Sequence, residues 1–252
     1  MKKRVDLHVH SEFSNDSNLK VEEILKKALK YDFYVAIADH NEIGGYLKSQ
    51  KLNNKGRVIA AIEAVSSEGV HILFYFVRKE NLIQFYINII DKYKTNDLYR
   101  LDINAFELMK AGKEHKAFIG IPHPFAKVTG LLNSTIDPTE HLKLADFYEK
   151  HNSSVTKSMN TKAALFHKNH QKNIPIIVGS DAHFLDEVGN ILLEIDDFKS
   201  QAQLFKNLKK KGAKIIGHSK LNIMSLIKKE LILIKKSKKL QYIKCRINRL
   251  SK

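Results

Sequence analysis

The sequence predicts a mostly parallel α/β fold, either a barrel or a doubly wound sheet. Short apolar runs rich in β-branched residues alternate with amphipathic stretches of helical spacing along most of the chain, an order typical of strands connected by helices. The length of 252 residues suits one large domain, or one domain with a small appendage. Hydrophobic residues make up 43% of the chain, which is enough to bury a sizeable core.

The expected strands and helices follow from the spacing of apolar residues. The strands are expected at Arg4–Val9, Phe33–Ala38, Arg57–Ile62, Gly69–Val77, Ala117–Ile121, Ile174–Gly179, Asn190–Ile195 and Ala213–Ile216. The helices are expected at Leu19–Tyr31, Glu42–Asn53, Asn81–Tyr93, Leu101–Ala111, Asn160–His170 and Gln201–Lys211. A further helix is expected to begin at Asp137 and Pro138, which suit the N-cap and the first helical position. Residues 79–115 hold two consecutive expected helices, which we interpret as a helical insertion over the barrel mouth.

The net charge of +16 is concentrated at the C-terminal end of the chain. From Lys199 onward there are 17 of the 43 basic residues but one of the 27 acidic residues, Glu230. Residues 1–198 therefore hold 26 of each kind and are neutral. The function of this larger part must be inferred from features other than charge.

The sequence also bears on the cellular compartment. Its single cysteine, Cys245, excludes an internal disulfide and a cysteine-rich zinc module. The start, MKKRVDLHVHSE, lacks the apolar segment of a signal peptide. No apolar run approaches the roughly 20 residues of a membrane-spanning helix. We therefore expect a cytoplasmic protein.

Histidines and carboxylates recur where the expected strands end. His8 and His10 lie two residues apart on the first strand and so point to the same face, and Asp181 and His183 have the same spacing. The other groups of this kind are His40, Glu63, His71 and His123. In parallel α/β folds, sites are built at the carboxyl ends of the strands. Imidazole and carboxylate without thiolate suit Zn, Mn or Fe, so the pattern predicts a metal-dependent hydrolase with two or three divalent cations.

Several segments, taken in order, resemble those of a known family. They are VDLHVHSEFSNDS, IADHNEIGGY, IEAVSSEGVHILFYF, IPHPF and VGSDAHF, and they span residues 5–183. In these segments the sequence resembles the PHP family (polymerase and histidinol phosphatase). The resemblance implies a distorted, TIM-like β/α barrel of seven strands, a trinuclear metal site at its C-terminal face and phosphoester hydrolysis.

The resemblance also implies which residues bind the metals. The first metal would be held by His8, His10, Glu63 and Asp181, the second by Glu63, His71 and His123, and the third by Asp16, His40 and His183. Glu63 would bridge two metals, and it is expected to act in catalysis together with Asp181 and His183. Asp39, next to a predicted ligand, either orients His40 or caps the following helix.

The expected reaction is hydrolysis of a phosphomonoester, carried by a small phosphorylated metabolite or a nucleotide. Two cations close together lower the pKa of a shared water and supply hydroxide for attack on phosphorus. The sequence lacks the G-x-S-x-G motif that would indicate a serine nucleophile. The alternative is a nuclease, or a nucleic-acid-associated module that uses the basic tail.

Residues 219–252 are predicted to form a basic amphipathic tail that follows a catalytic barrel of residues 1–218. Met224, Ile227, Leu231 and Ile234 have helical spacing, and the pattern resumes after a break near Ser237. The tail could pack on the body or on a twin subunit, dock on an anionic membrane surface, or attract nucleic acid. Because it follows the last expected ligand, it should not be needed for metal binding.

Overall fold

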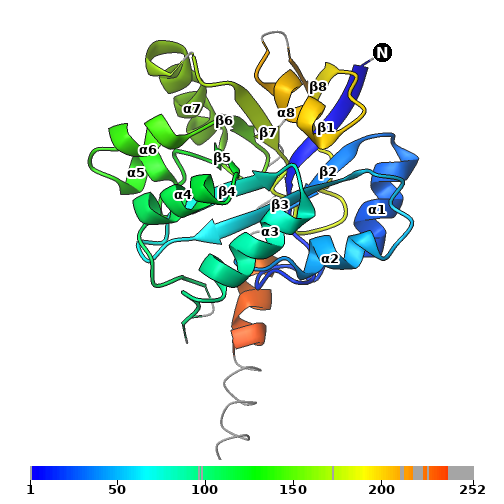
Figure 1. The fold of residues 1–252 in the computed structure, drawn as a ribbon, viewed down its shortest axis with the longest axis horizontal. Coiled ribbons are helices and arrows are strands. Elements are labelled where there is room, and N and C mark those ends of the chain that lie inside the picture. Colours follow the sequence, from blue (N-terminus) through cyan, green and yellow to red (C-terminus); the bar gives the residue numbers. More distant parts are fainter. Residues whose placement is uncertain are drawn as a thin grey trace, which may run out of the picture.

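The computed structural model describes residues 2–95, 97, 99–171, 173–210, 213–217, 224–225 and 227–237. Within them one nine-stranded sheet has the order β7-β6-β5-β4-β3-β2-β1-β8-β9 (Figure 1). The strands are β1 (Lys2–Val9), β2 (Tyr34–Ile37), β3 (Val58–Val65), β4 (His71–Phe76), β5 (Phe118–Ile121), β6 (Phe147–Asn152), β7 (Ile176–Gly179), β8 (Ile191–Asp196) and β9 (Lys214–Gly217). The helices are α1 (Val21–Lys30), α2 (Gly44–Gln50), α3 (Lys79–Phe85), the π-helix η1 (Tyr86–Ile90), α4 (Ala105–Glu114), α5 (Leu131–Ser134), α6 (Thr139–Leu144), α7 (Lys157–His170) and α8 (Gln201–Leu208).

The part of the sheet from β1 to β7 curls into a nearly closed barrel. Directly after β7, the amide of Asp181 donates to the carbonyl of His8 at 2.7 Å, and the amide of His10 donates to the carbonyl of Ala182 at 2.9 Å. These bonds bring the end of β7 back to β1, while β8 and β9 extend the sheet beyond β1 in antiparallel fashion. The predicted distorted barrel is confirmed.

Strand β4 accounts for the distortion. The pairs β1–β2, β2–β3, β5–β6 and β6–β7 are parallel, but β4 runs antiparallel to both β3 and β5. Because its direction is reversed, the first residue of β4, His71, lies opposite Val65 at the end of β3. A side chain at the start of β4 therefore reaches the same end of the barrel as side chains at the ends of the parallel strands.

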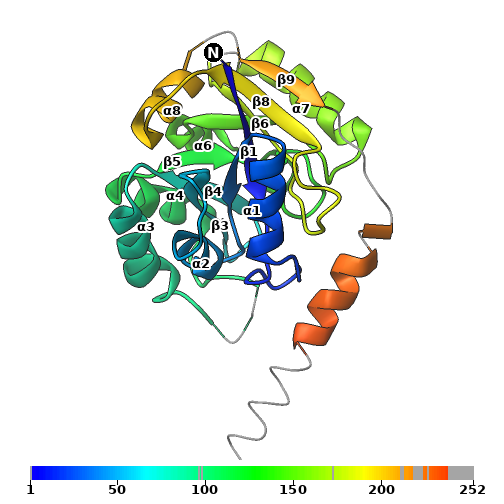
Figure 2. The ribbon, with the colours of Figure 1, turned by 90° about the vertical axis from the view of Figure 1, so that its right-hand side faces the viewer.

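The barrel interior is apolar along most of its length and polar at one end. On β3, Ile59 and Ala61 belong to an interior cluster with Leu73 and Tyr75 of β4. Because side chains alternate between the two faces of a strand, Glu63 continues the interior row of β3. The residues on the other faces of these strands pack against α1, α3 and α4, which cover the outside of the sheet (Figure 2). A charged residue thus follows directly on a row of buried apolar ones.

Two regions differ from the sequence expectations. Strand β6 was not expected, because Phe147 and Tyr148 are its only apolar residues. Residues 79–115 were expected to form a helical insertion over the barrel mouth. In the structure, helices α3 and α4 instead pack on the outer face of the barrel, and only the connection that carries Tyr99 reaches its polar end.

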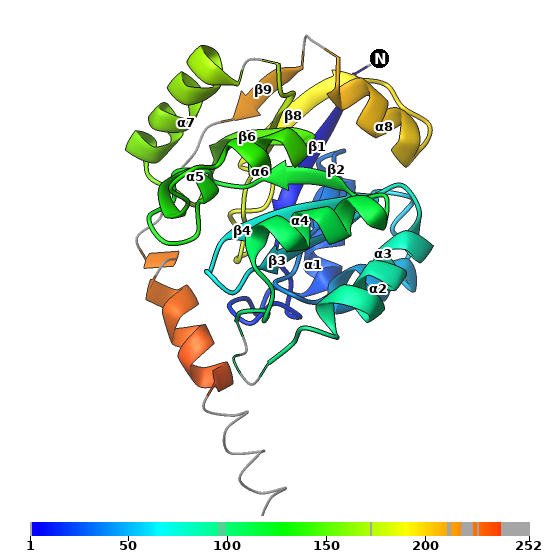
Figure 3. The same cartoon turned by 60° about the vertical axis from the view of Figure 1, so that its left-hand side comes forward.

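A last helix covers the described residues 224–225 and 227–237, and we call it the tail helix. It lies at the same end of the molecule as the connection between β1 and α1 (Figure 3). The second half of the predicted tail, from Leu240 to Leu250, lies outside the described residues, as do Cys245 and His218. The division into a barrel and a tail stays a prediction. Among the described residues, no helix has the length and apolarity needed to span a bilayer.

Candidate metal centre

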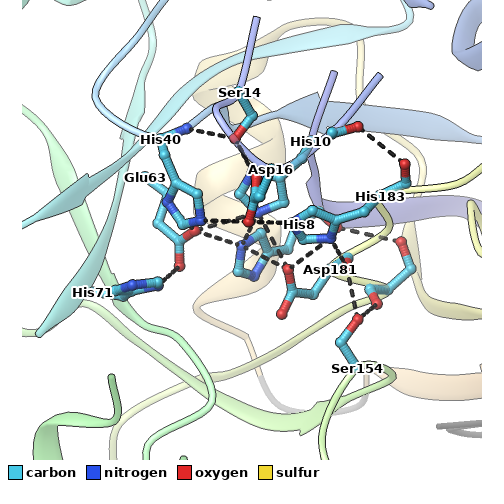
Figure 4. Close-up of polar contacts among 12 residues, drawn as sticks. His8, His10, Ser14, Asp16, His40, Glu63, His71, Ser154, Asp181 and His183 are labelled. Carbon is cyan, nitrogen blue, oxygen red and sulfur yellow. Dashed lines mark hydrogen bonds and ion pairs between the residues drawn. The ribbon is translucent and has the colours of Figure 1, made fainter. Parts of the chain in front are cut away.

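The nine predicted ligands form one buried cluster at the polar end of the barrel, and Figure 4 labels all of them except His123. They are His8, His10, Asp16, His40, Glu63, His71, His123, Asp181 and His183, none of them more than 6% exposed. They come from β1, β3, β4 and the segments that follow β1, β2, β5 and β7. The sequence pattern thus identified side chains that the fold brings together.

Three atoms of the first group have the spacing of ligands that share one ion. Nε2 of His8 and Nε2 of His10 lie 3.1 Å apart, and each is 3.3 Å from Oε2 of Glu63. Ligand atoms at about 2.1 Å from a tetrahedral ion are separated by about 3.4 Å, so His8, His10 and Glu63 fit a single divalent cation. Oδ1 of Asp181, the fourth expected ligand, lies 3.2 Å from Nε2 of His10 and 3.7 Å from Nε2 of His8.

Glu63 presents its two carboxylate oxygens to different sets of histidines. Oε1 lies 3.1 Å from Nδ1 of His71 and 3.2 Å from Nε2 of His123. Oε2 faces the first group and lies 3.1 Å from Nδ1 of His40. One carboxylate between two sets of ring nitrogens is the arrangement expected of a bridging ligand.

The third group surrounds Asp16. Its Oδ2 lies 2.9 Å from Nε2 of His183 and 3.4 Å from Nε2 of His40. The hydroxyl of Ser14 donates to Oδ1 of Asp16 at 2.7 Å and so fixes the carboxylate. These distances also bring His10 within reach of the group.

The hydrogen bonding of the cluster leaves room for cations. Nδ1 of His40 and Oε2 of Glu63 are buried, and neither has a hydrogen-bond partner in the described structure. Buried polar atoms without a partner are costly, and a cation between them would satisfy both. The donor set therefore fits divalent metal ions.

The electrostatics of the cluster agree with this. Burial raises the pKa of Glu63, but His8, His71 and His40 outweigh it, so that this pKa lies well below its usual value. Burial lowers the pKa of His71 to about 3 and that of His183 to about 4, although Glu63 and Asp16 oppose these shifts. Ionised carboxylate and neutral imidazole are the forms that bind metals.

His8 and His10 behave in the opposite way. Burial lowers the pKa of His8, but Glu63, Asp181 and Glu149 outweigh burial and hold it well above its usual value. Burial also lowers the pKa of His10, but Asp181 and Glu63 outweigh burial and raise it to about 9. The shifts reflect an excess of negative charge around these rings, which a bound cation would neutralise.

Glu149 on β6 is a site residue that sequence reasoning missed. Its Oε1 lies 3.2 Å from Nδ1 of His8, and its Oε2 accepts from the amide of His123 at 2.6 Å. Asn152 donates to the same Oε2 at 2.9 Å and to Oδ2 of Asp181 at 3.2 Å. A carboxylate on the far nitrogen of a ligating histidine fixes its orientation and tautomer. The only sequence signal was an acid that follows two aromatic residues.

Asp39 matches neither of the alternatives given above. Its carboxylate accepts from the amide of Ser11 at 2.5 Å and from the Ser11 hydroxyl at 2.8 Å. Helix α2 begins after Ile43, which occupies the N-cap position. Asp39 therefore holds the segment that leaves β1, and with it the loop that carries Asp16.

Tyr99 forms part of the rim of the cluster and was also missed. Its hydroxyl lies 3.4 Å from Nε2 of His71, and its ring centroid lies 5.2 Å from that of His40. The side-chain amide of Asn41 donates to the backbone carbonyl of Tyr99 at 2.9 Å. Asn41 has a φ of 51°, a left-handed conformation that asparagine tolerates better than most residues.

Comparisons with known proteins agree with the geometry. Residues 6–169 match the family model of the PHP domain, and residues 159–212 match that of a PHP-associated region. An uncharacterized protein of Methanocaldococcus jannaschii is 26% identical over 199 residues, which cover 77% of this chain and 71% of that relative.

Solved structures share the fold. An endonuclease Q, in complex with a duplex substrate that carries an abasic lesion, superposes with a TM-score of 0.69 at 21% identity. That match covers 87% of this chain and 60% of the endonuclease. A two-domain Bacteroides vulgatus protein, described as containing a PHP-like metal-dependent phosphoesterase, gives a TM-score of 0.63 at 13% identity over 86% of this chain and 65% of that protein. This chain thus spans less than two thirds of both structures.

Proposed function

This chain belongs to the PHP domain family, a family of hydrolases of phosphoric esters, and we propose that it hydrolyses a phosphoester at its nine-residue cluster. The observation that carries the proposal is the position of Glu63, whose two oxygens face separate sets of histidines. We propose that the cluster holds two or three divalent ions of Zn, Mn or Fe. When bound, such ions activate water and stabilise charge on the phosphoryl oxygens.

The protein's own groups would prepare the ligands for this role. Oε1 of Glu149 accepts a hydrogen bond from the protonated Nδ1 of His8, so Nε2 of that ring would turn its lone pair toward the cluster. Nδ1 of His183 donates to the carbonyl of Asp181 at 2.8 Å, which leaves Nε2 of His183 free to face Asp16. The buried partners fix both tautomers before any substrate arrives.

The first test is a panel of small phosphomonoesters, combined with elemental analysis of the purified protein. We expect at least about two equivalents of metal and turnover of one or more esters. Asp181→Asn should lower kcat by about a thousandfold or more, while Asp186→Asn, an exposed acid nearby, should retain activity. Full activity in Asp181→Asn would reject the proposed site.

A second candidate is a nuclease, favoured by the fold shared with endonuclease Q and by the basic residues after Lys199. It requires a higher kcat/KM for oligonucleotides than for mononucleotides, together with nucleic-acid binding that weakens as salt rises. Equal or slower cleavage of oligonucleotides would leave the phosphomonoester as the substrate. Docking of the tail on an anionic membrane surface stays a prediction.

A further inference from the structure

The tail helix contacts the barrel with its lysines rather than with its apolar stripe. Met224, Ile227, Leu231 and Ile234, the stripe expected to pack, are between 46% and 57% exposed. An amphipathic helix on a protein surface normally buries such a stripe. The face turned toward the barrel instead carries Lys229 and Lys236, together with the partly buried Ile232 and Leu233 between them.

Lys236 fixes the tail helix to the loop between β1 and α1. Its ammonium donates to the backbone carbonyls of Glu12 at 3.1 Å, Ser14 at 2.6 Å and Ser17 at 2.6 Å. These three acceptors satisfy the three donors of a lysine. The same loop carries Asp16, so the helix is attached to the segment that supplies a predicted metal ligand.

Lys229 reaches the cluster from this anchored helix. It lies two turns before Lys236 and therefore on the same helix face. Its Nζ is 3.6 Å from Oδ2 of Asp16, and its side chain is 23% exposed.

The position of this ammonium suits a phosphoryl group. At 3.6 Å the contact with Asp16 is an ion pair that lies beyond hydrogen-bonding distance, and the part of the chain that the structure describes supplies no hydrogen-bond acceptor for Nζ of Lys229. Among the described residues, Lys229 is the lysine or arginine that forms an ion pair with one of the nine predicted ligands.

We propose that Lys229 binds a phosphoryl oxygen of the substrate beside the metal cluster, and that Lys236 is the positioning residue that holds its helix in place. The proposal rests on the proposed phosphoesterase function. It assigns the tail a role in substrate binding, which extends the active site beyond the barrel that supplies the predicted ligands. Lysine serves as a compact positive charge for phosphate.

The test compares Lys229→Met with Lys228→Met in the full-length, metal-loaded protein. The ammonium of Lys228 lies over the ring of Phe184, 5.8 Å from its centroid, so this variant removes one charge from the same helix at a different place. Inorganic phosphate is titrated by calorimetry, and metal content is measured by elemental analysis. We expect Lys229→Met to weaken the phosphate Kd by about 10- to 100-fold, with unchanged metal content, and Lys228→Met to change it by less than about twofold.

Further variants separate the outcomes. Lys236→Met should also weaken phosphate binding, because it releases the helix that carries Lys229. An unchanged phosphate Kd in Lys229→Met, or a wild-type protein that does not bind phosphate, would overturn the proposal. Tighter metal binding or faster turnover in Lys229→Met would overturn it too, and would make Lys229 an inhibitory counter-ion. If the wild-type protein binds phosphate through Lys229 but hydrolyses no phosphoester, the proposed function fails while the binding role stands.

Discussion

Some predicted metal ligands are held by neighbouring side chains that are not themselves proposed to bind a metal. Glu149 contacts His8 through one oxygen and the amide of His123 through the other. It therefore links two predicted ligands that are expected to bind different metals. A neutral amide at this position could accept from only one of these groups with its single oxygen, and it would lose the charge that favours a metal-bound imidazole.

We therefore predict that Glu149→Gln weakens metal binding by about 10- to 100-fold while the fold is retained. The measurement is competition with a chelator of known affinity, followed by elemental analysis. Glu107→Gln on the exposed face of α4 is the matched control and should bind metal like the wild type. Equal metal affinities in Glu149→Gln and Glu107→Gln would show that Glu149 does not affect metal binding.

Among the elements, the junction of β7 with β1 is the one that closes the barrel. Gly179 ends β7, and a Cβ added there would lie 2.6 Å from Oε1 of Glu149 and even closer to Cβ of His8. The two strands can approach at this point only because residue 179 has no side chain. The close approach also sets the position of His8 relative to Asp181.

Gly179→Ala should lower the free energy of unfolding by about 1–3 kcal/mol through overpacking and should reduce metal content as well. Chemical denaturation and elemental analysis measure the two effects. Gly56→Ala provides the comparison, because a Cβ there meets nothing within 4 Å while its φ of +70° is left-handed. That variant should lose about 1 kcal/mol through backbone strain and keep its metal. Full metal content in Gly179→Ala would contradict the proposed crowding.

For the molecule as a whole, metal ions would act as cross-links between distant strands. The predicted ligands range from His8 on β1 to His183 after β7. Without cations, the carboxylates of Asp16, Glu63 and Asp181 lie together at one end of the barrel. A ligand that binds only the folded state stabilises it by mass action.

Removal of metal should therefore lower Tm. Each metal site stabilises the folded state by about 2.7 kcal/mol when the free metal concentration is about 100 times its Kd. In a chain of this size, that free energy corresponds to an increase in Tm of about 5–10 °C. Thermal unfolding is followed before and after chelation and again after metal is restored. Glu63→Gln should remove most of the metal-dependent increase in Tm, because it alters the ligand that is expected to bridge two metals. A wild-type Tm that does not respond to metal would argue against a polynuclear centre.

The sequence predicted much of this arrangement and missed identifiable parts of it. The rows that end in His8, His10 and Glu63 could be predicted because strand periodicity places alternate residues on one face. Strand β6 escaped notice because four of its six residues are polar, and Glu149 was missed with it. Tyr99 belongs to a connection without periodicity, so no local pattern marks it.

By itself, the sequence determined most of the residues that gather at the end of the barrel, because local spacing and the positions that follow each apolar run mark them, while Asp16 was implied by the family resemblance. Only the tertiary structure decided which side chains support or complete the cluster. Glu149 meets His8 across 141 positions of the chain, and Lys229 meets Asp16 because the tail helix turns its charged face inward. Such contacts depend on how distant elements pack and on the charge they meet there, and neither is encoded in the period of a single strand or helix.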